Sequence, residues 1–599
     1  MSSPSSPSSP SSPTSAKRLT YIPPIDGLRA LAVTAVLLYH LGLSWIPGGF
    51  LGVDLFFVIS GYVITRLILD SISRTGLLDL REFFFARLRR LYPALLFMMA
   101  GTTLLIALFA PDSIHRFLRD IPYVLTGTNN WRLVAVHQNY FESLGRPPLL
   151  QHTWSLGVEF QFYLIWPLIL IFAVNRFGKR NLAKVALLIA MISGTALFIF
   201  SLTVDSASSV YRISHIYFGT DTHSLGLFLG SALAVSWVPQ NLTPVITQRA
   251  QDFVDGVGVI GFIGLLTSFL FIDESNPTLY RIAFPLVSAF GCAVITSLVH
   301  PASRFAPLLS SRWILWIGAR SYGIYLWHWV IFQITRPNVD LAGATWAINF
   351  ARILIVLALA DISLRWIEIP IRRGVLSNWL RGLKYHTPRV RRKARAAIGG
   401  TILLSCLATS AAALGAIHRA DSAVDSTARM KTTIISTPAP SKPGVPGLWV
   451  TGDSVILGIH EKLASHLPVA LINAHVGRQI DELINVVKQD QPQVAHSIVI
   501  LDLGNNNRLT RGSVRTLLDL LKNQPKIIVV NTAVPRPWAS ENDLILNEVI
   551  PEYPNAILVD WAALSAGHPE YFAPDGVHLV DAGSDIYVAA ILEHLPKSL

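Results

Sequence analysis

The composition of this chain excludes an ordinary soluble protein. Of its 599 residues, 51% are hydrophobic and 14% are charged, and the mean hydropathy is +0.46, whereas soluble domains carry about 25% charged residues. A net charge of +12 would suggest nucleic acid as a partner of a soluble chain. Basic cytoplasmic loops explain that charge better here, so we expect a lipid bilayer and no nucleic acid as partner. Cys292 and Cys406 lie in apolar stretches, which argues against a disulfide framework or a Cys-based zinc site.

The N-terminal two thirds of the chain predicts a polytopic helical membrane domain. Residues 1–20 begin with a Ser/Pro repeat that has too little apolar surface to fold, so we predict a disordered cytoplasmic tail. Hydropathy then predicts about eleven membrane spans. Their approximate ranges are 25–45, 50–70, 91–110, 154–174, 182–204, 222–238, 254–272, 282–299, 314–335, 344–367 and 396–417. With the N-terminus in the cytoplasm the basic loops fall inside, and the odd number of spans places everything after Ile417 outside.

The chain changes character beyond these spans. Residues 376–446 predict a basic loop, a linking transmembrane helix and, from His418, a linker rich in Ser, Thr, Ala and Pro. In residues 447–599, short apolar stretches alternate with helix-like ones. The predicted strands are 448–451, 498–503, 527–531 and 557–560, and the predicted helices include 480–488 and 514–521. This alternation predicts a soluble α/β domain with a mostly parallel sheet.

The first predicted span carries three ionisable side chains. At about 100° and 1.5 Å per residue, Asp26, Arg29 and His40 fall on one helical stripe within about 40° of each other. Arg29 and His40 then lie about 16 Å apart along the axis, roughly half a bilayer. Ionisable side chains inside a membrane are costly and usually face a bundle interior or a wet cavity. This stretch therefore predicts a functional site rather than a simple anchor.

Polar side chains in the predicted spans also sort by depth. The outer set is His40, Asp54, Glu159 and His328, with Ser321 and Tyr325 on the stripe of His328, and the inner set is Arg29, Arg66, Arg87, Arg89 and Arg90. Arginines on the inner side suit the phosphates of a cytoplasmic donor. An outer histidine oriented by a carboxylate suits a general base for an acceptor hydroxyl. Acyl-coenzyme A has this shape, and we expect it as a donor substrate rather than as a bound cofactor.

Five motifs in this region resemble the membrane acyltransferase-3 family. They are Asp26-Gly-Leu-Arg-Ala-Leu-Ala-Val, Gly49-Phe-Leu-Gly-Val-Asp-Leu-Phe-Phe-Val-Ile-Ser-Gly61, Phe84-Phe-Ala-Arg-Leu-Arg-Arg-Leu-Tyr-Pro93, Trp154-Ser-Leu-Gly-Val-Glu-Phe-Gln-Phe-Tyr163 and Ser321-Tyr-Gly-Ile-Tyr-Leu-Trp-His328. The resemblance covers residues 21–375. It implies transfer of an acyl group, usually acetyl from acetyl-CoA, to a cell-envelope carbohydrate.

The same resemblance implies roles for individual residues. His40 is expected as catalytic base, supported by Arg29, Asp54 and Glu159, and Arg87 and Arg90 are expected on the donor side. Four further residues are candidates for the membrane site, namely Asp26, Ser321, Tyr325 and His328. One departure is Phe160, where the family often has a second acid, so a carboxylate pair at Glu159 is not carried over.

The C-terminal domain carries the parts of a serine esterase site. The predicted strand at 448–451 runs into Gly-Asp-Ser, which places Ser454 at a helix start with backbone N–H donors. Asp575 and His578 supply an acid and a base close in sequence, and Ser, Asp, His is a known order for a triad. Gly477 and Asn506 could supply oxyanion-hole donors.

These blocks together resemble the SGNH hydrolase family over residues 447–599. The resemblance implies an α/β/α, flavodoxin-like fold, with Ser454 as nucleophile, His578 as base and Asp575 orienting His578. It also implies an oxyanion hole made of the Ser454 N–H, Gly477 and Asn506. Neither this site nor the membrane site is expected to require a metal.

The whole chain thus predicts a bundle of about ten core helices and one linking helix, followed by an SGNH-like domain. We expect a membrane O-acyltransferase, and specifically an O-acetyltransferase, in a bacterial plasma membrane. Its C-terminal domain is expected outside. The acceptor is expected to be an envelope polysaccharide or glycolipid. Ser454 either relays the acyl group to the glycan or hydrolyses esters. Two other classes stay open, a membrane-tethered esterase and a transporter of an acyl donor or saccharide.

Overall fold

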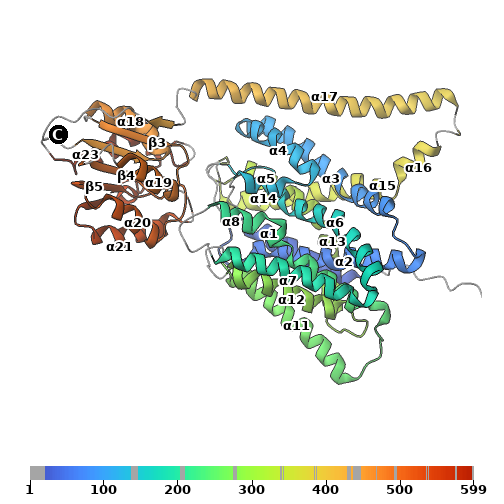
Figure 1. The fold of residues 1–599 in the computed structure, drawn as a ribbon. Helices are drawn as coiled ribbons and strands as arrows, with labels where there is room; N and C mark the ends of the chain where they lie inside the picture. Colours follow the sequence, from blue (N-terminus) through green and yellow to red (C-terminus); the bar gives the residue numbers. More distant parts are fainter. Residues whose placement is uncertain are drawn as a thin grey trace, which may run out of the picture.

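The structure consists of a helical bundle, one long helix beside it and an α/β domain at one end (Figure 1). It is a computed structural model that describes residues 21–599 except 137–145, 203–209, 274–278, 338–339, 342, 383–384, 386, 428–432, 436–446, 467–468, 492–495, 535, 537, 574–575 and 597–599. The predicted disordered tail, residues 1–20, lies outside the described residues.

Local signals fix several helix ends of the bundle. The Asp79 side chain accepts the Glu82 N–H at 2.9 Å at the start of α3, and Gly76 ends α2 with φ 78°. The helices are α1 Pro23–His40, α2 Gly52–Thr75, α3 Leu80–Phe109, α4 Ile114–Thr126, α5 Asn129–Ala135, α6 Trp154–Phe177, α7 Leu182–Ser201, α8 Val210–Phe218, α9 Thr220–His223, α10 Leu225–Ser236, α11 Gln248–Phe271, α12 Phe284–Leu298, α13 Arg312–Ile334, α14 Thr345–Ile362, α15 Ile369–Arg372 and α16 Val375–Gly382.

Eight helical segments in the described part of the chain are long and apolar enough to cross a membrane. They are Gly49–Thr75, Leu80–Phe109, Gln151–Phe177, Lys179–Ser201, Gln248–Phe271, Arg281–Leu298, Thr345–Arg372 and Pro388–Ala420. The other three predicted spans are the helices α1, α10 and α13. Helix α10 has only 12 residues, and α1 and α13 carry charges such as Arg29 and Arg320. Polarity is tolerated in α1 and α13 because neighbouring helices, rather than lipid, surround most of their side chains.

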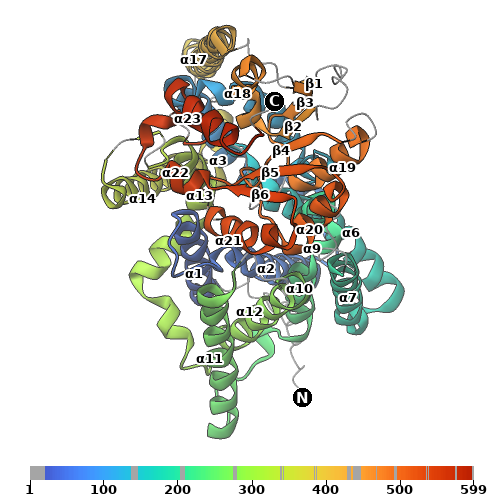
Figure 2. The same ribbon diagram turned by 90° about the vertical axis from the view of Figure 1, so that its left-hand side faces the viewer.

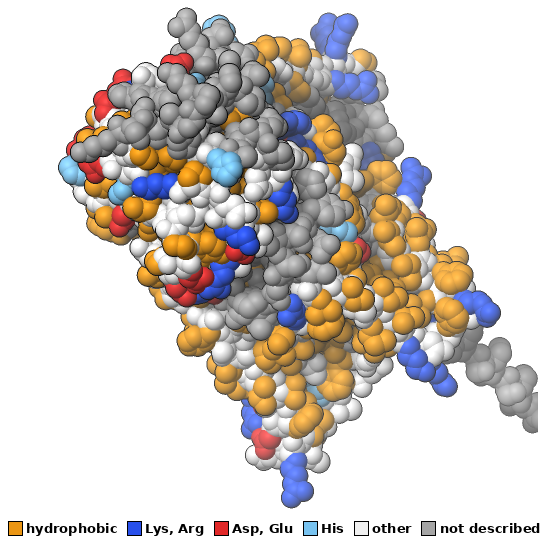
Figure 3. Space-filling view, turned by 60° about the vertical axis from the view of Figure 1, so that its left-hand side comes forward, with side chains coloured by type: hydrophobic (Ala, Val, Ile, Leu, Met, Phe, Trp, Pro, Cys, Tyr) orange, Lys and Arg blue, Asp and Glu red, His pale blue; other side chains and the backbone are white. Residues whose placement is uncertain are grey.

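The outer surface of the bundle is apolar. On α6 and α7, large hydrophobic side chains point outward. They include Leu164, Ile165, Leu168, Phe172, Leu187, Leu188, Met191 and Ile192. Figure 3 shows hydrophobic side chains spread over the flank of the bundle, whereas acidic and basic side chains are interspersed over the α/β domain. Apolar patches of this extent on a helical bundle are typical of lipid contact.

The linking helix is longer than predicted. Helix α17 runs over Pro388–Thr427, packs along α3 and α4, and ends beside the α/β domain, as Figure 1 shows. The prediction that a linker begins at His418 is therefore wrong, because the helix continues to Thr427. Alanines in residues 411–423 favour helix, and no glycine or proline after Gly415 interrupts it before Thr427.

The α/β domain contains a six-stranded sheet in the order β1-β3-β2-β4-β5-β6, which Figure 2 shows nearly edge on. All neighbouring pairs are parallel except β1 with β3. The strands are β1 Thr433–Ile435, β2 Leu448–Gly452, β3 Val469–His475, β4 Ile498–Asp502, β5 Lys526–Val530 and β6 Ala556–Val559. The four predicted strands and the mostly parallel sheet are confirmed, whereas β1 and β3 were not predicted.

Alternating strand residues bury the two faces of this sheet. Trp449, Val499 and Leu501 pack toward one layer of helices, and Val450 and Ile500 pack toward the other. The first layer is α19 Ile480–Asp490, α20 Arg511–Leu521 and α21 Ala539–Val549, and the second is α18 Ser454–His466 and α23 Asp581–Leu592, with the short α22 Trp561–Leu564 after β6. The result is the predicted α/β/α sandwich, with β2 as the strand at which the chain order reverses.

Candidate active sites

Helices α1 and α13 form the frame of the membrane site and run in the same direction. Near their starts they touch, because a Cβ atom added to Gly318 would lie 1.9 Å from the Asp26 carbonyl oxygen. Near their ends His40 and His328 meet. Only glycine permits so close an approach of two helix backbones. The two helices thereby present their polar side chains to each other from one end of the bundle toward the other.

The two histidines form a hydrogen-bonded pair whose tautomers follow from their partners. His328 Nδ1 lies 2.7 Å from the Tyr325 carbonyl oxygen, and His40 Nδ1 lies 2.9 Å from that of Val36. A carbonyl oxygen only accepts, so each Nδ1 carries the hydrogen. His40 Nδ1–H is then shared with His328 Nε2 at 3.2 Å. The unprotonated nitrogen of a neutral His40 is therefore Nε2, which is the atom that a general base needs.

Further polar groups extend from this pair along α13. The Tyr325 hydroxyl donates to the His152 carbonyl at 2.6 Å and accepts from Ser155 Oγ at 2.7 Å. His152 Nε2 lies 3.1 Å from the Leu326 carbonyl oxygen, and its ring centroid is 6.0 Å from that of His328. Sequence reasoning named Tyr325 and His328 but not His152, although His152 stands two residues before a quoted motif.

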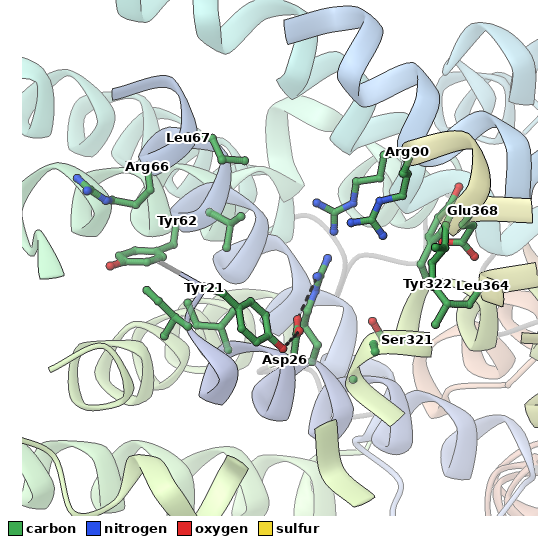
Figure 4. A pocket seen from close by; sticks show the side chains of 18 of the residues that line it. Tyr21, Asp26, Tyr62, Arg66, Leu67, Arg90, Ser321, Tyr322, Leu364 and Glu368 are labelled. Atoms are coloured by element: carbon green, nitrogen blue, oxygen red, sulfur yellow. Dashed lines mark hydrogen bonds and ion pairs between the residues drawn. The ribbon is translucent and has the colours of Figure 1, made fainter. Parts of the chain in front are cut away.

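A cavity of about 910 Å³ opens between the first halves of α1 and α13. Figure 4 shows side chains from α1, α2, α3 and the segment after α14 around it, with the Tyr21 hydroxyl 2.6 Å from the Asp26 carboxylate. The ionisable residues that line it are Tyr21, Asp26, Arg29, Arg66, Arg90, Tyr322, Glu368, Arg372 and Arg373, along with Tyr62. Five guanidinium groups against two carboxylates give this cavity an excess of positive charge, which is suited to an anionic ligand.

A second cavity continues from the first toward Tyr325. Both cavities are lined by Arg29, Arg90, Ser321 and Tyr322. The deeper one adds Ser60, Ser155, Glu159, Tyr163 and Tyr325. There Ser60 Oγ donates to one oxygen of Glu159 and the Tyr163 hydroxyl to the other at 3.2 Å. Shared lining residues thus connect the basic cavity, past Glu159, to Tyr325, whereas His40 and His328 are not among the described residues that line either cavity.

Two of the residues expected at the membrane site lie elsewhere. Asp54 Oδ1 pairs with His223 Nε2 at 2.9 Å, and both side chains are buried. The rings of Phe57, Trp154, Tyr217 and Phe284 surround His223. Arg87 lies over the Phe83 ring, 5.7 Å from its centroid, and is not among the residues that line either cavity. The expected roles of Asp54 and Arg87 therefore stay predictions, and sequence reasoning missed His223.

The α/β domain places Ser454 where a parallel sheet binds ligands. Strand β2 ends at Gly452, Asp453 follows, and Ser454 is the first residue of α18. The carboxyl ends of β2 and β4 meet at the point where the strand order reverses, which is the usual ligand site of such sheets. A Cβ atom on Gly452 would lie 3.0 Å from that of Asp502, so glycine keeps these strand ends together.

The predicted oxyanion residues lie at the same edge. Gly477, with φ 82°, follows β3, and Asn506 follows β4. Asn506 Nδ2 donates to Asp453 Oδ2 at 2.5 Å and to the Arg478 carbonyl at 3.1 Å. Both amide hydrogens of Asn506 are thereby engaged, and the side chain ties the loops after β2, β3 and β4 together. Its role as an oxyanion donor stays a prediction that requires one of these bonds to open.

His578 reaches this edge from a hairpin near the C-terminus. The Ala573 N–H donates to the His578 carbonyl at 2.7 Å, and Phe572 bridges to Leu579. Val577 and Val455, the neighbours of His578 and Ser454, line one small cavity. The pKa of Asp453 also responds to the charge of His578. These contacts bring the predicted base and nucleophile to one site, whereas Asp575 lies outside the described residues.

A buried pair of acids beside Ser454 was not predicted. Asp453 is 2% exposed and Asp502 is 4% exposed. Burial and the neighbouring Asp453 charge hold the pKa of Asp502 well above its usual range, and Asp502 donates a hydrogen bond to Asp453. Asn505 Nδ2 donates to both oxygens of Asp502, and the Val455 N–H donates to Asp453 Oδ1. Two acids this close share one proton, and here Asp502 keeps it.

Comparison with known proteins agrees with both halves of this arrangement. The acyltransferase domain of the acyltransferase-3 family matches residues 22–365. An O-acetyltransferase OatA of Staphylococcus aureus is 35% identical over 94% of this chain and 94% of its own. A peptidoglycan O-acetyltransferase OatA of Listeria monocytogenes is 32% identical over 96% of this chain and 98% of its own.

Among solved structures, the C-terminal catalytic domain of a Streptococcus pneumoniae peptidoglycan O-acetyltransferase with a methylsulfonyl adduct matches 25% of this chain and 92% of that chain, with 22% identity and a TM-score of 0.23. The strand order above, rather than this score, carries the fold assignment. The family match and the near full-length relatives together mean that the chain belongs to the membrane acyltransferase-3 family and is a membrane O-acetyltransferase with a C-terminal α/β domain.

Proposed function

We propose that this protein moves acetyl groups from acetyl-CoA to hydroxyls of a cell-wall glycan through two sites, one around His40 and one around Ser454. The observation that carries the proposal is the shared lining of the two bundle cavities, which runs from five arginines to Tyr325, whose carbonyl oxygen lies 2.7 Å from His328 Nδ1. Relatives named for peptidoglycan O-acetylation support the choice of acceptor.

The basic cavity suits coenzyme A as donor. Its phosphates carry the negative charge that Arg29, Arg66 and Arg90 would bind. Its thioester end is slender, and the deeper cavity past Ser321 has a volume of only about 60 Å³. Asp26, paired with Tyr21 and 3.5 Å from Arg29, holds one guanidinium in place. Acetyl-CoA is a substrate in this scheme, and the residues that hold it release free CoA after the transfer.

His40 is the base of the first transfer. The hydroxyl of a carrier alcohol gives its proton to His40 Nε2 as its oxygen attacks the thioester carbonyl, and this carrier delivers the acetyl ester to Ser454. The C–S bond breaks, and the proton passes to the CoA thiolate. His328 accepts the His40 Nδ1–H and so keeps Nε2 unprotonated at the start of each cycle. Glu159, held by Ser60 and Tyr163, places a carboxyl group beside Arg29 and Arg90 along the path.

Ser454 performs the second transfer. His578 removes the Ser454 hydroxyl proton as Oγ attacks the acetyl ester delivered from the bundle, and returns it to the leaving alcohol. A glycan hydroxyl then attacks the acetyl-serine ester, again with His578 as base. The Ser454 N–H at the start of α18 is the backbone donor for the developing oxyanion in this scheme, because the next one, of Val455, donates to Asp453 Oδ1.

Helix α17 supports an extracytoplasmic position for this second site. The first part of the helix carries a group of basic residues, whereas its last part ends beside the α/β domain. The basic residues are Arg389, Arg391, Arg392, Lys393 and Arg395. Because Lys and Arg next to a membrane span favour the cytoplasmic side, we place the other end of α17, and Ser454 with it, outside.

Single substitutions in cells test this proposal. His40→Ala and Ser454→Ala are compared with parent protein by mass spectrometry of ester-linked acetyl in the envelope glycan, and with His418→Ala and Ser465→Ala as exposed controls on α17 and α18. We expect both site variants to lose acetylation and both controls to keep it. Acetylation that survives His40→Ala contradicts the transferase site, and a rise in Ser454→Ala means that Ser454 hydrolyses esters instead.

A further inference from the structure

A groove of about 410 Å³ lies beside the Ser454 site, at the carboxyl ends of β5 and β6. Thr532, Ala533 and Val534 follow β5 and form its floor. Ala533 and Val534 also line the small cavity that touches Val455 and Val577. The groove is therefore a lateral extension of the space next to the nucleophile and the base. Ligand pockets typically enclose about 300–1,000 Å³, so this space is sufficient for one sugar residue or more.

The walls of the groove leave room and carry one charge. Most side chains that line it are small, namely Ala539, Ser540, Ala562, Ser565, Ala566 and Gly576. Phe572 adds an aromatic face, and its hairpin is the one that carries His578. Asp543 is the charged residue among the described residues that line it. No arginine or lysine is among the described residues that line the groove, in contrast to the basic cavity of the bundle.

Asp543 is anchored to the catalytic edge. The Thr532 N–H donates to Asp543 Oδ1 at 3.3 Å, and Thr532 Oγ1 donates to Asn505 Oδ1 at 2.6 Å. Asn505 in turn binds Asp502 and precedes Asn506. Burial raises the pKa of Asp543 to about 6, so the carboxylate is ionised at neutral pH. A half-buried carboxylate in a neutral groove suits a ligand that offers O–H and amide N–H donors rather than an anion.

We propose that this groove binds the acceptor glycan, with Asp543 accepting hydrogen bonds from a neutral hexosamine unit whose ring packs on Phe572. This inference rests on the proposed function, because it assigns the acceptor subsite of Ser454. A sugar has polar edges and an apolar ring face, and the groove offers a partner for each. The single negative charge of Asp543 disfavours the donor polyanion there.

The test separates acetyl chemistry from acceptor binding. The purified full-length chain in detergent is given 4-nitrophenyl acetate, which needs only the serine chemistry, and a soluble oligomer of β-1,4-linked N-acetylglucosamine as acceptor. Nitrophenol release reports acylation, and mass spectrometry of the oligomer reports transfer. Asp543→Asn removes the charge, and Ser540→Trp fills the groove from its exposed rim. Glu541→Gln and Ala563→Trp make matched changes at exposed positions that do not line the groove.

We expect Asp543→Asn and Ser540→Trp to keep nitrophenol release within about twofold of the parent. Both should raise the half-saturating acceptor concentration about tenfold or more. For Asp543→Asn this is the usual cost of losing a charged hydrogen bond, and for Ser540→Trp the added ring fills the groove. The two controls should behave like the parent. Parent-like acceptor dependence in both groove variants, or loss of nitrophenol release in Asp543→Asn, overturns the groove as acceptor site. Failure of the proposed function shows separately, as nitrophenol release and transfer that persist in Ser454→Ala.

Discussion

At the scale of single residues, His40, the proposed base of the membrane site, pairs with another histidine instead of a carboxylate. His328 Nε2 receives the His40 Nδ1–H, and backbone carbonyls fix the hydrogen on each Nδ1. Asp54, which was expected to support the membrane site, instead binds His223 among aromatic rings. A sequence cannot reveal such a pairing, because residues 40 and 328 lie 288 positions apart.

Two substitutions at His328 test its positioning role. His328→Gln places an acceptor near the Nε2 position, whereas His328→Phe removes it. We expect His328→Phe to lower kcat for acetyl transfer by roughly 10–100-fold, as for other residues that orient a catalytic histidine, and His328→Gln to restore most of the loss. Calorimetric binding of acetyl-CoA should be unchanged in both. Equal activity of the Phe and Gln variants would contradict the hydrogen-bonding role.

The acid pair beside Ser454 makes the stability of the α/β domain depend on pH. Asp502 holds its proton more tightly in the folded chain than in the unfolded chain, because burial and Asp453 raise its pKa. The folded domain therefore loses stability as the pH rises above about 4, the ordinary carboxyl value, toward the raised pKa. Asp502→Asn carries no proton to lose, so its stability relative to the parent should improve as pH rises.

Proteolysis of the intact chain measures this difference. The temperature at which trypsin begins to cut within the α/β domain is compared between parent and Asp502→Asn at about pH 5 and about pH 8. We expect the cutting temperature of Asp502→Asn to rise relative to that of the parent when the pH is raised. The cutting temperature of the exposed Asp581→Asn control should change little relative to the parent. If the difference in cutting temperature between parent and Asp502→Asn is the same at both pH values, Asp502 does not hold the proton.

At the scale of elements, close packing of α1 against α13 sets the membrane site. A Cβ atom on Gly318 would meet the Asp26 carbonyl oxygen at 1.9 Å, whereas one on Gly256 in α11 meets nothing within 4 Å. Gly318→Ala should destabilise the detergent-solubilised chain by about 1–3 kcal/mol, the usual cost of overpacking. Gly256→Ala should be neutral or stabilising by about 0.4–1 kcal/mol. Thermal unfolding compares the two, and equal unfolding temperatures would contradict the tight helix contact.

Elements with strong local patterns were predictable, and others were not. Hydropathy located the apolar helices, and β-branched stretches located β2, β4, β5 and β6. Strand β3 was missed because its Ala, Leu and Asn residues have weak strand preference and acquire their neighbours only in the folded sheet. Helix α17 was cut short because Ser and Thr near its end resemble a linker. Motif residues such as His40 and Ser454 could be named in advance, whereas Asp502, His152 and His223 acquire their partners through tertiary contacts.

At the scale of the whole molecule, the two proposed acyl-transfer sites differ in chemistry and occupy different parts of one chain. The bundle offers arginines to an anionic donor, and the α/β domain offers a neutral groove with one carboxylate beside its serine. Figure 1 places the α/β domain at the end of the bundle away from α15 and α16. This separation favours a relay in which donor and glycan never share a site.

The most direct test of the relay follows labelled acetyl from acetyl-CoA in proteoliposomes that contain the full-length chain and a soluble glycan acceptor. The relay predicts that the parent labels the glycan, and that His40→Ala and Ser454→Ala both fail to do so. It also predicts that His40→Ala still releases nitrophenol from 4-nitrophenyl acetate, because Ser454 remains intact. Glycan labelling by Ser454→Ala at the parent rate would contradict the relay, since the bundle would then acetylate the glycan without the second site.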